Sequence, residues 1–420
     1  MNRPTPLFAA FVALLLLSAC GDDNASPVTE SSPPDDPESY DVDTSVEYDI
    51  SMSQPRFVVP GDGLPADIEP NLANNNVDII FHDHVLYMAW RSAPSHFASP
   101  DTVMWLVSSR DLGETWSLEH RISIGSDMRE PRFVSYKNRL FLMFFEAGSD
   151  MFEFDPRRVW RTWFEAPGRW TELEVMVDQP EVPWDVKVRH GNVYLTSYMG
   201  NHYETGQESS VEVYFSQSVD GSTFTRVNGR EYVYKGGVSE CAFEFDQTGN
   251  LWVVTRNEDG DSSGFGSHVC FAPREDLSAW QCPATCSPHR YDSPEMFRHG
   301  DDIFLVARRD IGGPYDMGLT GLSFDEQKEK YLMSYSLRAK TTALYKIDQA
   351  HREVVHLTDL PGAGDTAFAS VKRMDAHSYL MVNYTSPLDD PDITWLAGQA
   401  SNRGTQLYLM TITFTPKQAR

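Results

Sequence analysis

Basic residues are scarce in this 420-residue sequence: Lys and Arg number 35 against 61 Asp and Glu, which gives a formal net charge of -26. Nucleic acids bind to positive protein faces, so this charge argues against a nucleic acid as a partner. Helical periodicity is also almost absent after residue 49. Short β-branched and aromatic runs alternate there with Gly, Asp, Asn and Pro, a pattern that predicts an all-β protein.

The sequence has one long apolar run near its start, Leu7 to Leu17, which is too short to cross a bilayer as a helix. Arg3 precedes the run, and Leu-Ser-Ala-Cys ends it at Cys20. This arrangement resembles a bacterial lipoprotein signal peptide, which implies removal of residues 1–19 and lipidation of Cys20. The membrane would then be contacted through this lipid only. The Gly and Asp that follow the cysteine favour the outer over the inner membrane of the cell envelope, by resemblance to sorting signals.

From Gly21 to about Asp49 the sequence is rich in Asp, Glu, Ser and Pro and contains no Lys or Arg. Such a composition cannot bury enough apolar surface to fold. Residues 20–48 are therefore predicted to form an acidic disordered tether, and residues 49–416 to form the folded domain.

Cysteine is scarce as well, with four residues beyond the predicted lipidation site: Cys241, Cys270, Cys282 and Cys286. An even number in an exported protein predicts two disulfides, for which three connectivities exist. We favour Cys270 with Cys282, which flank a hairpin, and therefore Cys241 with Cys286. A zinc site is the alternative, but the sequence lacks paired C-x-x-C units and a suitably spaced His.

A repeating unit follows the tether, made of an acidic residue, an apolar strand, a polar turn and a second apolar strand. Its acidic residues are Asp78, Glu130, Asp185, Glu240, Glu295 and Asp365. They are 52, 55, 55, 55 and 70 residues apart, the last spacing being lengthened by an insertion at about Gly312–Lys330. Units of this length with four short strands are propeller blades, so we predict one domain, a monomeric six-bladed β-propeller. Five blades plus an extra domain is the alternative, but the spacing leaves no room for a linker.

The last blade ends on its third strand, at residues 406–414. A fourth strand must come from elsewhere, and residues 48–59 are the candidate. Pairing of the two ends of the domain would close the ring and remove an exposed sheet edge.

Two turns carry a shared motif. Ser109–Trp116 reads S-x-D-x-G-x-T-W, and Ser218–Phe224 is a copy that is one residue shorter and ends in Phe. Gly113 supplies a φ > 0 position, and Asp111 can cap the backbone of its own turn. The motif resembles the Asp-box, or BNR repeat, of sialidase-type β-propellers. This resemblance implies a propeller of the sialidase type and an activity on glycans.

The resemblance to sialidases covers only some of their catalytic and substrate-binding residues. Glu240 and Arg256 match a sialidase segment in which a glutamate assists the tyrosine nucleophile and an arginine binds the substrate carboxylate. Residues 76–78 (Asn-Val-Asp) stand where sialidases place an Arg-Ile-Pro motif, and residues 364–368 contain no tyrosine nucleophile. Residues 91–97 replace the loop that carries the acid/base aspartate.

The innermost strand of each propeller blade lines the central channel, so we expect the six repeat acids to gather at one mouth. Like charges gathered there bind a cation, pair with arginines or raise one another's pKa, and calcium is the cofactor that suits such oxygen ligands. The metal ligands themselves remain unassigned. Each acid can equally bond the backbone of the neighbouring blade. His96 has an ordinary pKa near neutrality, which suits a proton donor or acceptor.

We therefore expect a lipid-anchored glycoside hydrolase that acts on an extracellular or periplasmic glycan through paired carboxylates. The catalytic candidates are Glu240, Glu295, Asp365, Asp185 and His96. Arginine forks match the two oxygens of a sugar carboxylate or sulfate. The substrate-binding candidates are Arg91, Arg256, Arg308, Arg129, Asp78 and Glu130. A non-catalytic glycan- or protein-binding propeller is the alternative, because fold alone does not settle function, and a polysaccharide lyase is a third hypothesis.

Overall fold

The computed structural model describes residues 40–151, 153–203 and 209–417. The predicted signal peptide, the lipidation site at Cys20 and most of the predicted tether lie outside these residues. Within the described part of the chain, no helix is long and apolar enough to span a membrane.

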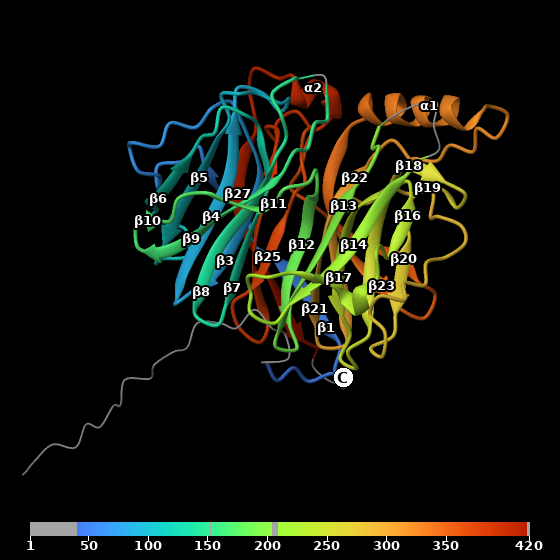
Figure 1. Cartoon of the computed structure of the whole chain (residues 1–420), viewed down its shortest axis with the longest axis horizontal. Coiled ribbons are helices and arrows are strands. Elements are labelled where there is room, and N and C mark those ends of the chain that lie inside the picture. Colours follow the sequence, from blue (N-terminus) through green and yellow to red (C-terminus); the bar gives the residue numbers. More distant parts are fainter. Residues whose placement is uncertain (1–39, 152, 204–208, 418–420) are drawn as a thin grey trace, which may run out of the picture. The chain divides into compact units, whose positions relative to one another are not determined.

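Six antiparallel sheets form the blades of a propeller (Figure 1). Blade 1 contains β3 (Ala73–His82), β4 (Val85–Ala93), β5 (Val103–Ser109) and β6 (Ser117–Ile122). Blade 2 contains β7 (Met128–Tyr136), β8 (Arg139–Glu146), β9 (Val159–Ala166), β10 (Arg169–Trp170) and β11 (Glu174–Val177). Blade 3 contains β12 (Val182–Arg189), β13 (Asn192–Met199), β14 (Val211–Ser218), β15 (Thr225–Arg226) and β16 (Tyr234–Gly236), with a 3-10 turn at Val227–Gly229.

The other three blades follow in chain order. Blade 4 contains β17 (Val238–Phe245), β18 (Leu251–Asp261), β19 (Gly264–Gly266) and β20 (Val269–Ala272). Blade 5 contains β21 (Asp292–His299), β22 (Asp302–Asp310), β23 (Lys340–Asp348) and β24 (Glu353–Leu360). Blade 6 contains β25 (Ser370–Arg373), β26 (Ser378–Thr385), β27 (Gln406–Pro416), β1 (Tyr48–Met52) and β2 (Arg56–Val59).

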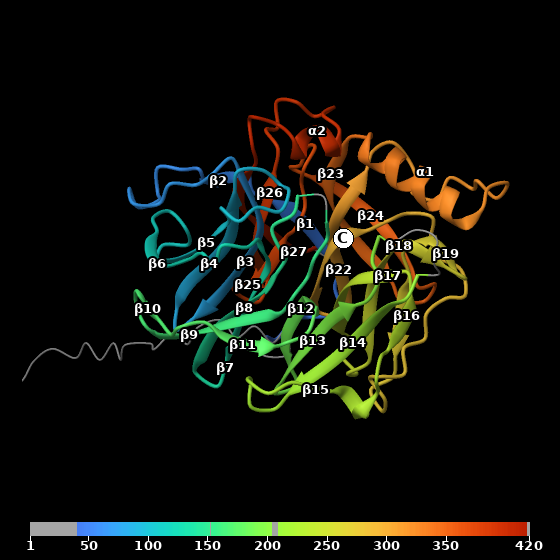
Figure 2. The same cartoon turned by 45° about the horizontal axis from the view of Figure 1, so that its top comes forward.

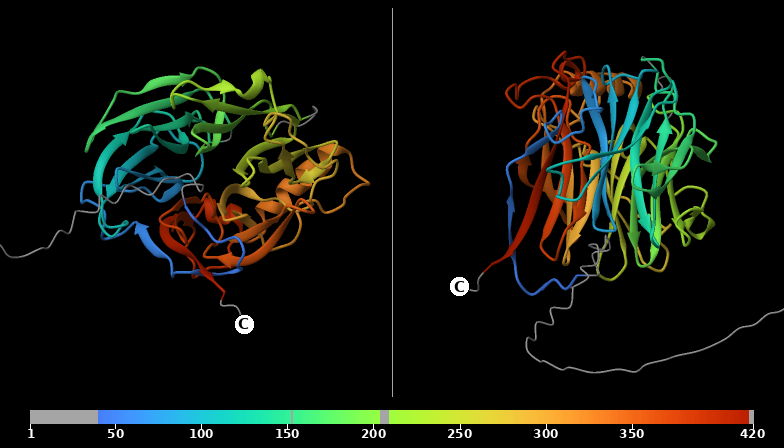
Figure 3. Two further views of the ribbon diagram at one scale, coloured as in Figure 1. Left: turned by 90° about the horizontal axis from the view of Figure 1, so that it is seen from below. Right: turned by 90° about the vertical axis from the view of Figure 1, so that its left-hand side faces the viewer.

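The innermost strands of the blades form a closed ring. β3, β7, β12, β17, β21 and β25 each contact the innermost strand of the next blade, and β25 contacts β3 (Figure 3). Apolar residues pack between neighbouring blades, as Leu106 of blade 1 does with Leu142 of blade 2 in one cluster. The predicted six-bladed propeller is therefore confirmed.

The N-terminal segment closes the ring, as the sequence predicts. β1 pairs antiparallel with β27 from Tyr48 opposite Pro416 to Met52 opposite Ile412, and β2 pairs with β27 farther along. The outer edge of blade 6 is thus built from the two ends of the domain, which leaves β27 paired on both sides.

The two motif turns join the third and fourth strands of blades 1 and 3. In the first turn, Gly113 has φ 83° and Asp111 Oδ1 accepts a hydrogen bond of 2.9 Å from the Thr115 N–H. Hydrogen bonds from Thr115 lower the pKa of Asp111 to about 2. In the second turn, Asp220 accepts from the Ser222 and Thr223 N–H groups. Both turns are therefore stabilised locally by their own aspartate, away from the ring axis.

Helices are present where the sequence indicates none. α1 (Phe324–Ser336) lies between β22 and β23 at the insertion predicted in blade 5, and α2 (Trp395–Gln399) lies between β26 and β27. Both helices sit at the same end of the ring (Figure 1, Figure 2). A capping box between Ser323 and Glu326 starts α1. The apolar stripe of α1 is weak because its buried positions are two tyrosines and a lysine, which explains why the sequence pattern missed it.

One of the two predicted disulfides is present. Cys270 is bonded to Cys282, whereas Cys241 and Cys286 are both free, so the predicted Cys241–Cys286 bond is wrong. The Cys241 side chain packs in the apolar core shared with blade 3. The Cys286 sulfur instead lies 3.2 Å from His268 Nε2, in a separate polar cluster of blade 4.

Candidate functional site

One cavity of about 730 Å³ receives residues from all six blades. Blades 1 to 6 contribute, in order, residues such as Asn76, Glu130, Tyr198, Glu240, Arg308 and Tyr384. Trp395 of α2 also lines it, so the cavity opens at the end of the ring where the helices lie (Figure 1). A site built from every blade is held by the closed ring rather than by one mobile loop.

β-bulges in the inner strands determine which acids reach this cavity. The strand register shifts in β3, β7, β12, β17 and β21, in each case near the cavity end of the strand. Glu130, with φ 52°, and Glu240 lie within such bulges and line the cavity. A bulge adds a residue and re-aims the side chains around it. The sequence gives no direct signal for this shift.

Glu240 is held on β17 by two donors. Its Oε1 lies 2.8 Å from Arg256 Nη1, and its Oε2 accepts a 2.7 Å hydrogen bond from the Ser293 N–H. Burial raises the pKa of Glu240 to about 7, although the Arg256 charge opposes the shift. Glu240 and Arg256, the two residues that match the sialidase segment, are thus in contact in the structure.

Glu130 is the second carboxyl group in the cavity. Its Oε2 accepts a 3.0 Å hydrogen bond from the Asn76 side-chain amide. Burial raises the pKa of Glu130 to about 7, and the charge of Glu130 in turn helps to raise that of Glu240. With pKa values raised to about 7, each of the two carboxyl groups is partly protonated near neutral pH.

Because its pKa is raised in the folded protein, Glu130 lowers the free energy of unfolding at high pH. The native state holds a proton that the unfolded chain has released above its ordinary pKa of 4.5, so stability falls as the pH rises from about 4.5 to 7. We expect Glu130→Gln to raise the free energy of unfolding by about 1–3 kcal/mol at pH 8 and by much less at pH 4.5. Urea denaturation at both pH values measures the difference. A gain that is equal at both pH values would mean that Glu130 is not protonated in the folded protein.

His96 belongs to the loop between β4 and β5 and lines the same cavity. Its Nδ1 lies 2.7 Å from Asp365 Oδ2, and Asp365 Oδ1 accepts a 2.9 Å hydrogen bond from the Tyr384 hydroxyl. Burial lowers the pKa of His96, so the ring is neutral at pH 7. Burial alone would raise the pKa of Asp365, but the contacts with His96 and Arg308 lower it. With Nδ1 donating to a carboxylate, Nε2 is the nitrogen that remains for a ligand.

Arg91 lies behind the cavity rather than in it. Its side chain is fully buried, and its Nε lies 2.7 Å from Asp127 Oδ1. Its Nη1 and Nη2 donate to the carbonyl groups of Ser95 and Phe97 at 3.3 and 2.9 Å. The predicted role of Arg91 in binding substrate is therefore wrong in its geometry, and the residue holds the loop that carries His96.

The other predicted acids are also outside the cavity. Asp78 accepts a 2.7 Å hydrogen bond from the Phe133 N–H of the next blade. Asp185 pairs with Lys187 at 2.8 Å, and Glu295 lies 3.6 Å from the same Lys187. These three acids follow the bulges and contact inner-strand residues of other blades rather than lining the cavity, so the predicted mouth of six acids does not form.

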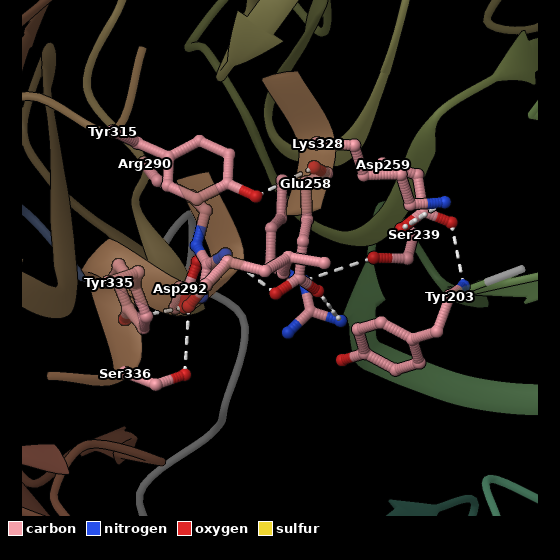
Figure 4. Close-up of polar contacts among 12 residues, drawn as sticks. Tyr203, Ser239, Glu258, Asp259, Arg290, Asp292, Tyr315, Lys328, Tyr335 and Ser336 are labelled. Atoms are coloured by element: carbon pink, nitrogen blue, oxygen red, sulfur yellow. Dashed lines mark hydrogen bonds and ion pairs between the residues drawn. The ribbon is translucent and has the colours of Figure 1, made fainter. Parts of the chain in front are cut away.

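A buried ionic cluster lies beside the cavity in blades 4 and 5, and sequence analysis missed it (Figure 4). The Arg290 guanidinium stacks 3.5 Å from the Tyr335 ring and pairs with Glu258 at 2.6 Å and Asp292 at 2.5 Å. Glu258 also lies 3.4 Å from Arg256, which lines the cavity. This cluster neutralises charge behind the arginines of the site. Its sequence signal was weak, because its members do not recur from blade to blade.

Aromatic side chains complete the cavity wall. Phe97, Phe154, Tyr198, Tyr203 and Trp395 all line it. The rings of Phe154 and Tyr203 are 5.8 Å apart, and both residues are partly exposed, at 38 and 40%. Aromatic faces beside carboxyl groups are suited to holding a sugar ring. Phe154 and Trp395 come from segments between blade strands, outside the repeat, and were not predicted.

Among the described residues, no group of three or more His, Cys, Asp or Glu side chains is placed to hold a metal ion. The calcium ion expected at an acidic mouth therefore has no ligand set in this part of the chain.

No protein-family model matches the sequence, and no curated protein matches it. The fold is nevertheless similar to solved structures. A Dyadobacter fermentans protein of unknown function is 11% identical, with a TM-score of 0.56 and coverage of 87% of this chain and 99% of that one. The phage phi92 endosialidase is 11% identical, with a TM-score of 0.54 and coverage of 90% and 70%.

Trypanosoma rangeli sialidase in complex with the inhibitor DANA is 12% identical, with a TM-score of 0.56. The match covers 86% of this chain and 59% of that protein, so this chain spans less than two thirds of its length. At these identities the comparisons show a shared sialidase-type propeller fold.

Proposed function

We propose that this protein is a glycoside hydrolase whose chemistry is performed by Glu130 and Glu240. The observation that supports the proposal is that two carboxyl groups with raised pKa values line one aromatic-lined cavity. Hydrolysis of a glycosidic bond needs one carboxyl group to protonate the leaving oxygen and a second to act as nucleophile or base. The fold shared with sialidases supports the same kind of activity.

The two carboxyl groups differ in what surrounds them, and this difference assigns their roles. Glu240 contacts a guanidinium cation and a backbone N–H, both of which stabilise its charged form. Glu240 is therefore the nucleophile or base. Glu130 accepts from a neutral amide, so it is the group that keeps its proton and donates it to the leaving oxygen. His96 accepts a hydrogen bond from a substrate hydroxyl through Nε2.

This assignment predicts a bell-shaped dependence of kcat/KM on pH, centred near neutrality. At low pH Glu240 becomes protonated and cannot attack, while at high pH Glu130 has lost the proton it must donate. Initial rates from pH 4 to 9 at constant ionic strength measure both limbs. Activity that stays constant up to pH 9 would contradict a proton-donating Glu130.

A panel of glycans tests the proposed activity directly. Soluble protein beginning at Ser26 is incubated with sialosides, uronic-acid glycans and neutral glycans, and new ends are detected by mass spectrometry beside Glu240→Gln. We expect cleavage that the variant lacks. Binding without cleavage would leave a glycan-binding propeller, and a product with ultraviolet absorption from a new double bond would indicate a lyase.

We further propose that the hydrolase is anchored to the bacterial envelope by lipid at Cys20. The motif at residues 17–20 supports this location. Metabolic labelling with an alkyne fatty acid should mark the full-length protein and not Cys20→Ser. Equal labelling of both would exclude this anchor.

A further inference from the structure

The arginines of the cavity are occupied by groups of the chain itself. Arg308 donates from all three guanidinium nitrogens, through five contacts of 2.6 to 3.4 Å. Their acceptors are Thr366 O, Asp292 Oδ2, Tyr335 Oη, Ser293 Oγ and Ala367 O. A guanidinium has five N–H donors, so none of those of Arg308 is left for a ligand.

Arg256 is similarly occupied. Its Nε donates to Ser239 Oγ at 3.0 Å, its Nη1 pairs with Glu240 at 2.8 Å, and its Nη2 lies 3.1 Å from His202 Nε2. Nη2 is also 3.4 Å from Glu258, in the cluster that Figure 4 shows. The two parallel N–H groups that would grip a carboxylate are therefore already bonded.

Arg129, the third arginine of the wall, is partly occupied. Its Nε pairs with the buried Asp127 at 2.6 Å, and its Nη2 donates to the His96 carbonyl at 2.7 Å. Asp127 also faces Arg91, so Arg91 and Arg129 share one carboxylate and donate to three loop carbonyl groups. Arg129 still offers a ligand the two N–H groups of Nη1 and the second N–H of Nη2.

Acidic side chains also line the cavity. Glu153 and Asp155 lie in its wall beside Glu130 and Glu240, and Asp155 pairs with Arg157 at 2.8 Å. A carboxylate entering the cavity would lose its water and find free donors only on Arg129, whose charge already faces Asp127, and it would approach Glu153, Asp155 and Glu240. An uncharged sugar meets no such penalty, because its hydroxyl groups can bond single acceptors and its ring can stack on Phe154 or Trp395.

We propose that the cavity selects an uncharged sugar and rejects sugars that carry a carboxylate. This inference rests on the proposed glycosidase function and names the substrate class of the same site. The predicted use of Arg256 and Arg308 as clamps for a sugar acid is thereby replaced by a structural use, in which they balance the carboxylates of the site.

Matched ligands that differ only in charge test the inference. Glucuronic, galacturonic and sialic acid are presented as methyl glycosides in the free-acid and methyl-ester forms, beside methyl glucosides, galactosides and arabinosides. Binding is measured by calorimetry with Glu130→Gln, which mimics the protonated acid and keeps the charge of the cavity. We expect the uncharged forms to bind at least tenfold more tightly than the free acids.

Glu240→Gln provides the converse measurement. This variant removes the carboxylate that neutralises Arg256 and frees its Nη1, so the affinity for the free acids should rise relative to Glu130→Gln. If both variants prefer the uncharged forms over the free acids to the same extent, the arginines do not determine this preference.

The outcomes separate this inference from the proposed function. Cleavage by the wild-type protein of an acidic glycan in preference to its ester would overturn the inference and keep the glycosidase. Tighter binding of uncharged sugars with no cleavage of any glycan would keep the inference and remove the glycosidase. If no ligand of the set binds or is cleaved, the inference and the proposed glycosidase function are both contradicted.

Discussion

Replacing Glu240 with glutamine should lower kcat for glycan cleavage by about 1,000-fold or more, while the protein stays folded. Loss of one essential group commonly costs two to three orders of magnitude or more in rate. Glutamine keeps the shape of the side chain and an oxygen that accepts from the Ser293 N–H. It removes the negative charge that attacks the sugar or activates water and that also pairs with Arg256. Steady-state kinetics on the glycan found by the panel measures the effect.

Glu295→Gln is the matched control for this variant. Glu295 is also a buried glutamate on an inner strand, but it faces Lys187 rather than the cavity. We expect its kcat per folded molecule to stay within about threefold of the wild-type value, in the range of changes away from the reacting groups. If Glu295→Gln loses as much activity as Glu240→Gln, or if Glu240→Gln keeps more than a tenth, the assignment fails.

The leaving group distinguishes the two carboxyl groups. An aryl glycoside whose phenol departs as an anion needs no proton from the enzyme. Glu130→Gln should therefore retain most of its activity on such a substrate and lose it on the natural glycan, while Glu240→Gln should lose both. The opposite pattern would exchange the two roles.

The fold was predictable because the same pattern of strands and turns recurs along the chain. Each blade contains apolar strands at similar spacing, so the six units, the closing segment at residues 48–59 and the two motif turns could be placed before the structure was known. α1 could not, because its buried face is made of Tyr331, Tyr335 and Lys328, which do not form an apolar stripe. Only the capping box at Ser323 gave a signal for it.

The site was predictable only to the extent that its residues follow the repeat. Glu130 and Glu240 were placed at inner strands, and Arg256 and Arg308 at second strands, and all four line the cavity. The spacing could not show which of the six repeat acids would face the opening, because backbone bulges shift the register and turn three of them toward inner-strand residues of other blades. Partners such as Arg290 come from outside the aligned positions.

Arg91→Met should be among the most destabilising single changes in the described chain, although Arg91 does not line the cavity. Arg91 is fully buried, and its removal leaves Asp127 with a less complete set of partners. Breaking a buried ion pair by removing one partner costs about 3–5 kcal/mol. Urea denaturation should show a loss of that size.

Arg91→Met should also lower the catalytic rate, because Arg91 donates to the carbonyl groups on both sides of His96. At a temperature where the variant is fully folded, we expect kcat to fall about tenfold, which corresponds to about 1.4 kcal/mol, with a smaller change in KM. Arg110→Met, in an exposed turn, is the matched control and should stay within about 0.5 kcal/mol of the wild-type stability. A destabilised Arg91→Met that keeps full kcat would show that Arg91 supports the fold but does not position the His96 loop.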